Sequence, residues 1–176
     1  MVPVVINFLA FLALIALAGF LVLAIGSRTA WRNTLAREVG PVAGWLAAAV
    51  ALVATAGSLY LSEVAGFIPC FLCWIQRGFM YPLAVVLLIP RIRRSLPSRL
   101  IAIALIGGAV SLYHYGVEHV PALEETSFCA VSNPCSAIWV NKFGFMTIPF
   151  MALAGFLAIS SLVATGRRWR RTVLAS

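Results

Sequence analysis

Residues 69–77 of the chain read PCFLCWIQR, and this stretch opens a strongly apolar segment that extends to residue 90. It holds two cysteines separated by two residues, Cys70 and Cys73, and an arginine, Arg77, four residues after the second. If residues 69–90 form one helix, these three residues lie on one face, because positions i, i+3 and i+7 share one side of an α-helix. The stretch therefore predicts a dithiol and a cation on one stripe of a helix at a membrane surface.

The composition of the whole chain is that of a protein that crosses a membrane several times. Of its 176 residues 62% are apolar and only 10% are charged, and the mean hydropathy is +1.02. A soluble domain has roughly half apolar and a quarter charged residues. Because a spanning helix needs about 20 residues, the chain has room for about five spans and for no separate soluble domain. We therefore predict a single membrane domain over residues 1–176.

Apolar segments separated by short polar connections predict the positions of the spans. They lie at residues 3–26, 41–61, 69–90, 100–117 and 144–165. The second segment is rich in small residues at three- and four-residue spacing, which is typical of helices that pack closely in a bilayer. The predicted fold class is an all-α integral membrane protein with five transmembrane helices.

The basic residues indicate how the spans are oriented. The net charge of +8 would suit a nucleic-acid partner, but most of the 13 basic residues lie in three short segments between or after spans, at 28–37, 91–99 and 167–171. Cytoplasmic loops carry such an excess of Lys and Arg. We therefore expect contact with membrane lipid and no nucleic acid, with the N-terminus outside, the C-terminus in the cytoplasm and both cysteine pairs on the outer face. No basic residue precedes residues 3–26, so we expect a retained span and not a cleaved signal peptide.

The one long connection, residues 120–143, carries the second cysteine pair, Cys129 and Cys135. A loop of this length in a compact protein is usually functional. Most of the acidic residues belong to the same predicted outer side, namely Glu63, Glu118, Glu124 and Glu125. Chemistry that involves the four cysteines is therefore expected at this end of the molecule.

Three uses of the cysteines compete: structural disulfides, a zinc site and a redox relay. A Cys-x-x-Cys bridge closes a very short loop and gains little stability from doing so, although Cys129 and Cys135 remain a candidate structural bridge. A four-cysteine zinc site usually has two closely spaced pairs, and an oxidising compartment disfavours thiolates, so no metal is expected. A relay explains more, because a helix N-terminus lowers a thiol pKa and a mobile loop can bring one pair to the other.

Electrons collected by a membrane dithiol need an acceptor, and a quinone is the simplest two-electron carrier that is soluble in a bilayer. At about 1.5 Å of rise per residue, Arg77 lies about 10 Å below Cys70. There it either turns into the bundle and stabilises quinone or thiolate, or extends to lipid phosphate. His119, with Glu118 beside it, is a candidate proton donor or quinone contact, and so is His114, about one turn deeper. Nothing in the sequence separates the two histidines.

With these residues the chain resembles the DsbB family of membrane disulfide-formation proteins, and more specifically its BdbC-like branch. The likeness is carried by Pro69-Cys70-x-x-Cys73-x-x-x-Arg77, by Glu118-His119, by the Cys129 and Cys135 loop, and by the FGFMTIP sequence at 143–149. It covers about residues 41–165. The resemblance implies a four-helix transmembrane bundle over these residues, with residues 3–26 as an extra N-terminal span.

The resemblance also implies a thiol:quinone oxidoreductase in the bacterial inner (cytoplasmic) membrane. Cys129 would be the cysteine attacked by a DsbA-like thioredoxin-fold partner, Cys135 would resolve onto Cys70, and Cys73 would face the quinone. Arg77 would bind and polarise the quinone, which would be either ubiquinone or menaquinone.

Two alternatives stay open at the level of sequence. Quinone reductases of the vitamin K epoxide reductase type also carry four cysteines on a four-helix bundle, but their Cys-x-x-Cys follows the loop pair, whereas here it comes first. A non-enzymatic membrane scaffold braced by two disulfides is the alternative from another class. The spacing of Cys129 and Cys135 is also shorter than in the best-known proteobacterial members of the family, so their loop motions are not carried over.

Overall fold

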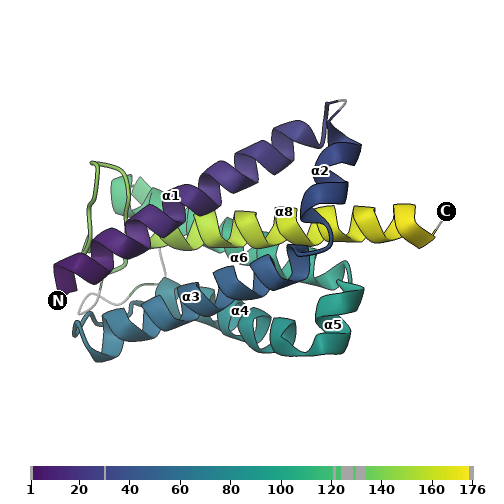
Figure 1. Cartoon of the computed structure of the whole chain (residues 1–176). Helices are drawn as coiled ribbons and strands as arrows, with labels where there is room; N and C mark the ends of the chain where they lie inside the picture. The colour runs from purple at the N-terminus through teal and green to yellow at the C-terminus, as the bar shows by residue number, and fades with distance from the viewer. Residues whose placement is uncertain (1, 30, 121, 124–128, 130–133, 175–176) are drawn as a thin grey trace.

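The structure is a computed structural model, which describes residues 2–29, 31–120, 122–123, 129 and 134–174 (Figure 1). Within these ranges the chain is helical, and the only strand-like pairing is an isolated bridge between Lys142 and Met146. The helices follow one another as α1 (Val2–Gly26), α2 (Arg32–Val39), α3 (Ala43–Glu63), α4 (Phe71–Leu88), α5 (Pro90–Ser95), α6 (Arg99–His119) and α8 (Ile148–Leu174).

Five of these helices, α1, α3, α4, α6 and α8, are long and apolar enough to cross a membrane. The predicted all-α membrane bundle with five spanning helices is thus confirmed. The connection between the end of α1 and the start of α3 contains the short helix α2. A second short helix, α5, begins at Pro90, and α4 ends just before it because a residue that precedes proline disfavours the helical conformation.

Helix α8 begins later than the predicted residue 144. Lys142 and Met146 exchange two backbone hydrogen bonds of 3.0 and 2.8 Å, which close a tight turn. Two residues inside this turn, Phe143 and Gly144, have φ values of 55° and 80°, in the left-handed region. A helix cannot pass through such a turn, so α8 starts after it, at Ile148.

Helix α8 is the central helix of the bundle, since it packs against α1, α2, α3 and α6. Phe156, in the first half of α8, is fully buried. A Cβ atom at Gly107 of α6 would lie 2.5 Å from the Phe156 ring, so the close approach of α6 and α8 requires glycine at that position. Helix α4 completes the bundle by packing between α3 and α6.

The two ends of the bundle differ in chemistry. Helices α2 and α5 and the C-terminus lie at one end of the bundle (Figure 1). The N-terminus lies at the other end, with the start of α4 and the end of α6 (Figure 1). The three basic segments therefore share one end and the cysteines share the opposite one. Helix α1 runs obliquely to α3, and the two helices diverge toward α2 (Figure 1).

Candidate functional site

The first cysteine caps helix α4 and does not lie within it. Cys70 has an extended backbone conformation, and its sulfur accepts a hydrogen bond from the backbone N–H of Cys73 at 3.4 Å. A side-chain acceptor at this position satisfies one of the free N–H groups of the first helical turn. Helix α4 therefore begins at Phe71, and the expected start of the helix at residue 69 is corrected.

The two thiols of the motif are reduced and lie close together. The Sγ atoms of Cys70 and Cys73 are 3.2 Å apart, so a small movement would bring them to the bond length of about 2.05 Å in a disulfide. Cys70 is buried and Cys73 is half-buried. Their sulfurs are thus near each other but have different surroundings.

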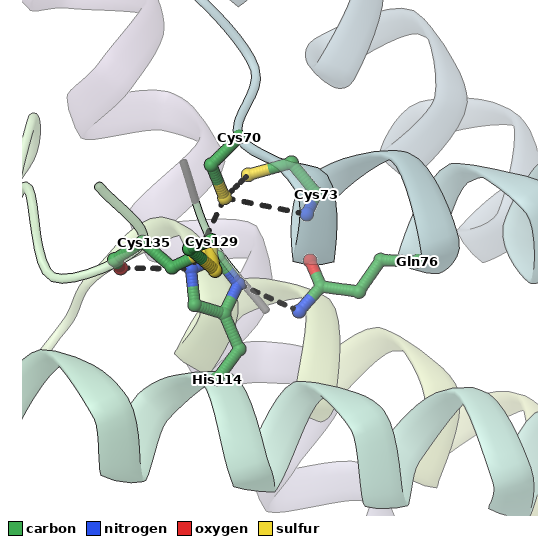
Figure 2. The surroundings of a disulfide bond; sticks show 6 residues. All are labelled: Cys70, Cys73, Gln76, His114, Cys129 and Cys135. Carbon is green, nitrogen blue, oxygen red and sulfur yellow. Dashed lines mark hydrogen bonds between the residues drawn. A yellow bond between two sulfur atoms is a disulfide. The ribbon is translucent and has the colours of Figure 1, made fainter. Parts of the chain in front are cut away.

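His114 of α6 connects Cys70 to the second cysteine pair (Figure 2). Its ring is buried, with Nε2 at 3.5 Å from the sulfur of Cys70 and at 3.1 Å from the carbonyl oxygen of Cys135. The side-chain amide of Gln76 lies 3.2 Å from Nδ1. If this amide donates to Nδ1, the ring proton is on Nε2, between the sulfur and the carbonyl. The structure thereby separates the two histidines that the sequence left equivalent.

The second pair, Cys129 and Cys135, is joined in a disulfide and lies next to Cys70 and His114 (Figure 2). The sulfurs of Cys70 and Cys135 and a ring nitrogen of His114 all lie within 4.8 Å of one another. Cys135 is almost completely buried, whereas Cys129 is partly exposed. Two pairs from distant parts of the sequence thus form one buried cluster of four sulfurs.

The surroundings of Cys70 favour its thiolate. Its sulfur is within hydrogen-bond distance of the Cys73 thiol, the His114 ring and the Cys73 N–H group. The interaction with the Cys73 thiol is the largest of these, and together they lower the pKa of Cys70 to about 4, although burial alone would raise it. The sequence predicted this direction from the helix N-terminus, but the neighbouring thiol contributes more.

A small cavity of about 20 Å³ lies between the two cysteine pairs, and its walls include Cys70, His114, Glu118 and Cys135. It is large enough for about one water molecule. Glu118 lies beside Thr147, and the Oε2 atom of Glu118 and the hydroxyl of Thr147 are both buried without the geometry of a hydrogen bond to any described residue. Of the predicted pair Glu118 and His119, the glutamate therefore reaches the cluster.

His119 lies elsewhere. The side chain of His119 is exposed, and its Nδ1 atom is 2.9 Å from the carbonyl oxygen of Tyr115. The rings of His119 and Tyr115 are tilted by 37° with their centroids 4.3 Å apart. The structure brings it neither to the sulfurs nor to a cavity wall. The predicted contact of His119 with a quinone stays a prediction. Glu124 and Glu125 lie outside the described residues.

A much larger cavity of about 350 Å³ begins on the other side of Cys73. Its walls come from α1, α3, α4 and α8 and are mostly apolar, and its few polar groups include Ser58, Gln76, Arg77 and Tyr81. Arg77 faces this cavity and Cys70 faces His114 and the small one, whereas Cys73 lines both cavities. The predicted stripe of two thiols and a cation thus extends from the small cavity to the large one.

Arg77 turns toward α3. Its guanidinium donates a hydrogen bond of 3.0 Å to the carbonyl oxygen of Ser58 and lies 5.1 Å from the ring centroid of Trp74. The hydroxyl of Tyr81 donates to the hydroxyl of Ser58 at 3.4 Å. The cation therefore forms part of the wall of the large cavity, which answers the question that the sequence left open about its direction.

A metal ion has little to bind to in this arrangement. Cys70, His114 and Cys135 are the one group of potential ligands among the described residues, and the sulfur of Cys135 is held in a disulfide. Zinc binds thiolates and not disulfides. The expected absence of a metal stays a prediction.

Sequence reasoning missed Gln76, Ser58 and Tyr81. Gln76 lies three residues after Cys73, on the same side of α4. A polar amide at this spacing within an apolar span could have indicated a site residue. Ser58 and Tyr81 offered no comparable signal, because their importance depends on how α3 and α4 pack.

Comparison with known proteins gives consistent results. The family described as "Disulfide bond formation protein DsbB" matches residues 41–166. The chain is 44% identical over 110 residues to "Probable disulfide formation protein C 1" of Bacillus anthracis, which covers 61% of this chain and 79% of that protein. It is 43% identical over 119 residues to "Disulfide bond formation protein C" of Bacillus subtilis (strain 168), covering 66% and 84%. No solved structure matches the chain significantly.

Proposed function

This chain belongs to the DsbB family of disulfide bond formation proteins, and from this premise we propose that it is a thiol:quinone oxidoreductase. It is a multi-pass membrane protein of disulfide bond formation. In the proposed reaction it reoxidises a DsbA-like thioredoxin-fold partner through Cys129 and Cys135. It then passes the electrons to Cys70 and Cys73, and finally to a membrane quinone, ubiquinone or menaquinone.

The observation that carries the proposal is the distance of at most 4.8 Å between the sulfurs of Cys70 and Cys135. Thiol–disulfide exchange requires a thiolate to attack a disulfide sulfur directly. At this distance exchange between the two pairs needs only local movement.

The first step is exchange with the partner. A partner thiolate attacks Cys129, which is the more exposed member of the loop disulfide, and Cys135 leaves as a thiolate. The second thiol of the partner then displaces Cys129 and closes the partner's disulfide. The partner loses two electrons and two protons, and Cys129 and Cys135 become a dithiol.

The second step moves the electrons inward. Cys135 attacks Cys70 of a Cys70–Cys73 disulfide, and Cys73 leaves as a thiolate. Cys129 then attacks Cys135, which restores the loop disulfide and releases Cys70. A low pKa makes Cys70 a good leaving group in this last displacement. His114, whose ring lies between Cys70 and the Cys135 backbone, holds a proton at the place where these charges form.

The large cavity fits a quinone. Its walls are mostly apolar with a few polar groups near one place, which is the usual character of a small-molecule site. Arg77, with Ser58 and Tyr81 beside it, would hold the quinone oxygens, and Cys73 lines the same cavity. A bound quinone supplies the capacity to accept the two electrons and two protons of the dithiol. Cys70 and Cys73 then return to their disulfide.

We further propose that residues 41–165 form the family's four-helix core and residues 3–26 an additional span of the same membrane domain. The basic end would face the cytoplasm, and the cysteine end would face outward from a bacterial cytoplasmic membrane. A scaffold braced by two disulfides is less well supported, because the sulfurs of Cys70 and Cys135 lie within 4.8 Å of each other and Cys70 contacts the buried His114.

The proposal is tested with Cys73→Ala in lipid nanodiscs that contain quinone. This variant keeps the loop disulfide and Cys70, so it should form a mixed disulfide with a reduced thioredoxin-fold protein. It should not oxidise that protein repeatedly, because its inner pair is incomplete. Partner oxidation and quinol formation are measured together, with the unchanged chain as the reference. Normal quinone reduction by Cys73→Ala would contradict the proposed relay.

A further inference from the structure

Helix α1 lies outside residues 41–166, which match the family, yet it lines the same cavity as Cys73 and Arg77. We propose that α1 is a wall of the quinone site and guides the apolar tail of the quinone to the lipid between α1 and α3. This inference rests on the proposed quinone reaction and adds to it a role for the first span. The role is specificity for the tail and not chemistry at the ring.

Four of the five residues of α1 that line the cavity form one helical stripe, and the fifth, Ile15, lies at its edge. Leu9, Leu12, Ala13 and Ala16 follow the spacing i, i+3, i+4 and i+7, so they lie on one face of the helix. Helix α1 contains no charged residue. It can therefore contact an apolar chain along this face but offers nothing to hold the polar ring, which is left to Arg77 on α4.

Helix α1 packs tightly against the start of α8 on one side of the cavity. On the other side, toward α3, α1 makes fewer contacts. Ala10 and Ala13 of α1 are buried in a cluster with Met146 and Ala154, which joins α1 to the start of α8. Toward α3, the contact is made near the outer end, where a Cβ atom at Gly57 would lie 2.8 Å from Leu9. Beyond that contact the two helices diverge (Figure 1). Between these diverging segments the cavity is lined by Ile15 of α1 and Val53 of α3.

The rim of the cavity between α1 and α3 is apolar. Ile15 of α1 and Val53 of α3 both line the cavity, and their side chains are 62% and 40% exposed. Because both residues belong to spanning helices, this exposed surface meets lipid tails and not water. A water-soluble acceptor would need a polar opening. The rim thus suits an acceptor that carries a long hydrocarbon tail into the bilayer.

Ala16→Phe tests this role by adding a ring on the cavity side of α1. Ala18→Phe is the matched control, because it makes the same change on the same helix at an exposed position that does not line the cavity. Binding is measured by quenching of tryptophan fluorescence, since Trp139 lines the cavity, with a long-tailed menaquinone and with a naphthoquinone that has no tail. The quinone that co-purifies with each variant is quantified as well.

We expect Ala16→Phe to weaken binding of the long-tailed quinone about tenfold, because overfilling a packed site costs enough for such a change. Binding of the tail-less quinone should change less than about twofold, and Ala18→Phe should bind both as the unchanged chain does. Unchanged binding of the long-tailed quinone by Ala16→Phe would overturn the inference. Equal weakening of both quinones would also overturn it, since the tail would then not be what α1 contacts.

A second measurement needs no variant. A quinone with a photoreactive group on its tail is bound to the unchanged chain, activated, and located by peptide mass spectrometry. Labelling of residues 9–16 together with α3 supports the inference, and labelling confined to α4 and α8 overturns it. The proposed function itself fails separately, if the unchanged chain reduces no quinone with a dithiol partner. Exchange between the partner and the loop disulfide without quinone should be the same in Ala16→Phe and in the unchanged chain.

Discussion

The reactivity of the buried cluster depends on one sulfur that receives three interactions. Cys70 lies within reach of a thiol, an imidazole and a backbone N–H group, and each of these stabilises a negative charge on it. Cys73 faces the large cavity and lacks such a set of partners among the described residues. Two cysteines that are chemically equivalent in the sequence therefore have different surroundings in the structure.

The lowered pKa of Cys70 leads to a prediction about pH. A thiol whose pKa is about 4 is ionised throughout the range above that value, so alkylation of Cys70 should change little between pH 8 and about pH 5. In Cys73→Ala the largest stabilising interaction is lost, so the pKa should rise and alkylation at pH 5 should fall. The measurement is the rate of Cys70 alkylation against pH, read by peptide mass spectrometry in the reduced protein. The same pH profile in both proteins would contradict this account.

His114 should matter for exchange between the two pairs. His114→Gln removes a group that can hold and release a proton beside Cys70, and such a group commonly contributes 10²- to 10⁴-fold to a rate. We expect a loss of at least about tenfold in transfer from the loop pair to the inner pair, with attack by the partner on Cys129 little changed. Rapid-quench thiol trapping separates these two steps. His119→Gln is the comparison, and equal effects of the two substitutions would contradict the special position of His114.

At the scale of the elements, the close approach of α6 and α8 depends on a single glycine. A Cβ atom at Gly107 would lie 2.5 Å from the Phe156 ring, whereas one at the adjacent Gly108 would meet the Cβ of Phe156 at an ordinary 3.6 Å. Gly107→Ala should therefore destabilise the bundle by about 1–3 kcal/mol, because the added methyl group forces the buried Phe156 ring or the two helices to shift. Gly108→Ala, in the same helix, should be nearly neutral. Thermal unfolding in detergent compares them, and similar midpoints for the two variants would contradict the prediction.

The sequence predicted the existence of the spanning helices better than their positions and rotations in the bundle. The spans followed from long apolar runs, and the reactive pair followed from the spacing of Cys70 and Cys73. The position of α1 could not be predicted, because a helix that is apolar on every side gives no sign of which face it buries. The choice between His114 and His119 depended on the rotation of α6 against α4, which one apolar helix sequence does not determine. The N-cap at Cys70 was missed because sulfur is not among the usual capping acceptors.

At the scale of the whole molecule, the bundle separates charge from redox chemistry. The basic segments lie at the end that holds α2 and α5, and the start of α4 lies at the other end (Figure 1). The four cysteines are close together at the start of α4. If the basic end faces the cytoplasm, the proposed partner reaches Cys129 from outside. The electrons then move inward through Cys70 and Cys73 to a quinone in the large cavity. The direction of electron flow would then follow from the distribution of arginines along the chain.

This orientation can be tested with two single cysteines in a chain whose four native cysteines are replaced by alanine. Glu63→Cys places a thiol at the end of α3 near the redox cluster, and Ser95→Cys places one at the end of α5 among the arginines; both positions are exposed. A membrane-impermeant maleimide added to intact spheroplasts should label Glu63→Cys, because that end is proposed to face outward. Ser95→Cys should be labelled only after the membrane is permeabilised, since the end with the basic residues around it is proposed to lie in the cytoplasm. The reverse pattern would place the loop disulfide in a reducing compartment, where it would not persist, and would therefore contradict both the orientation and the proposed direction of the relay.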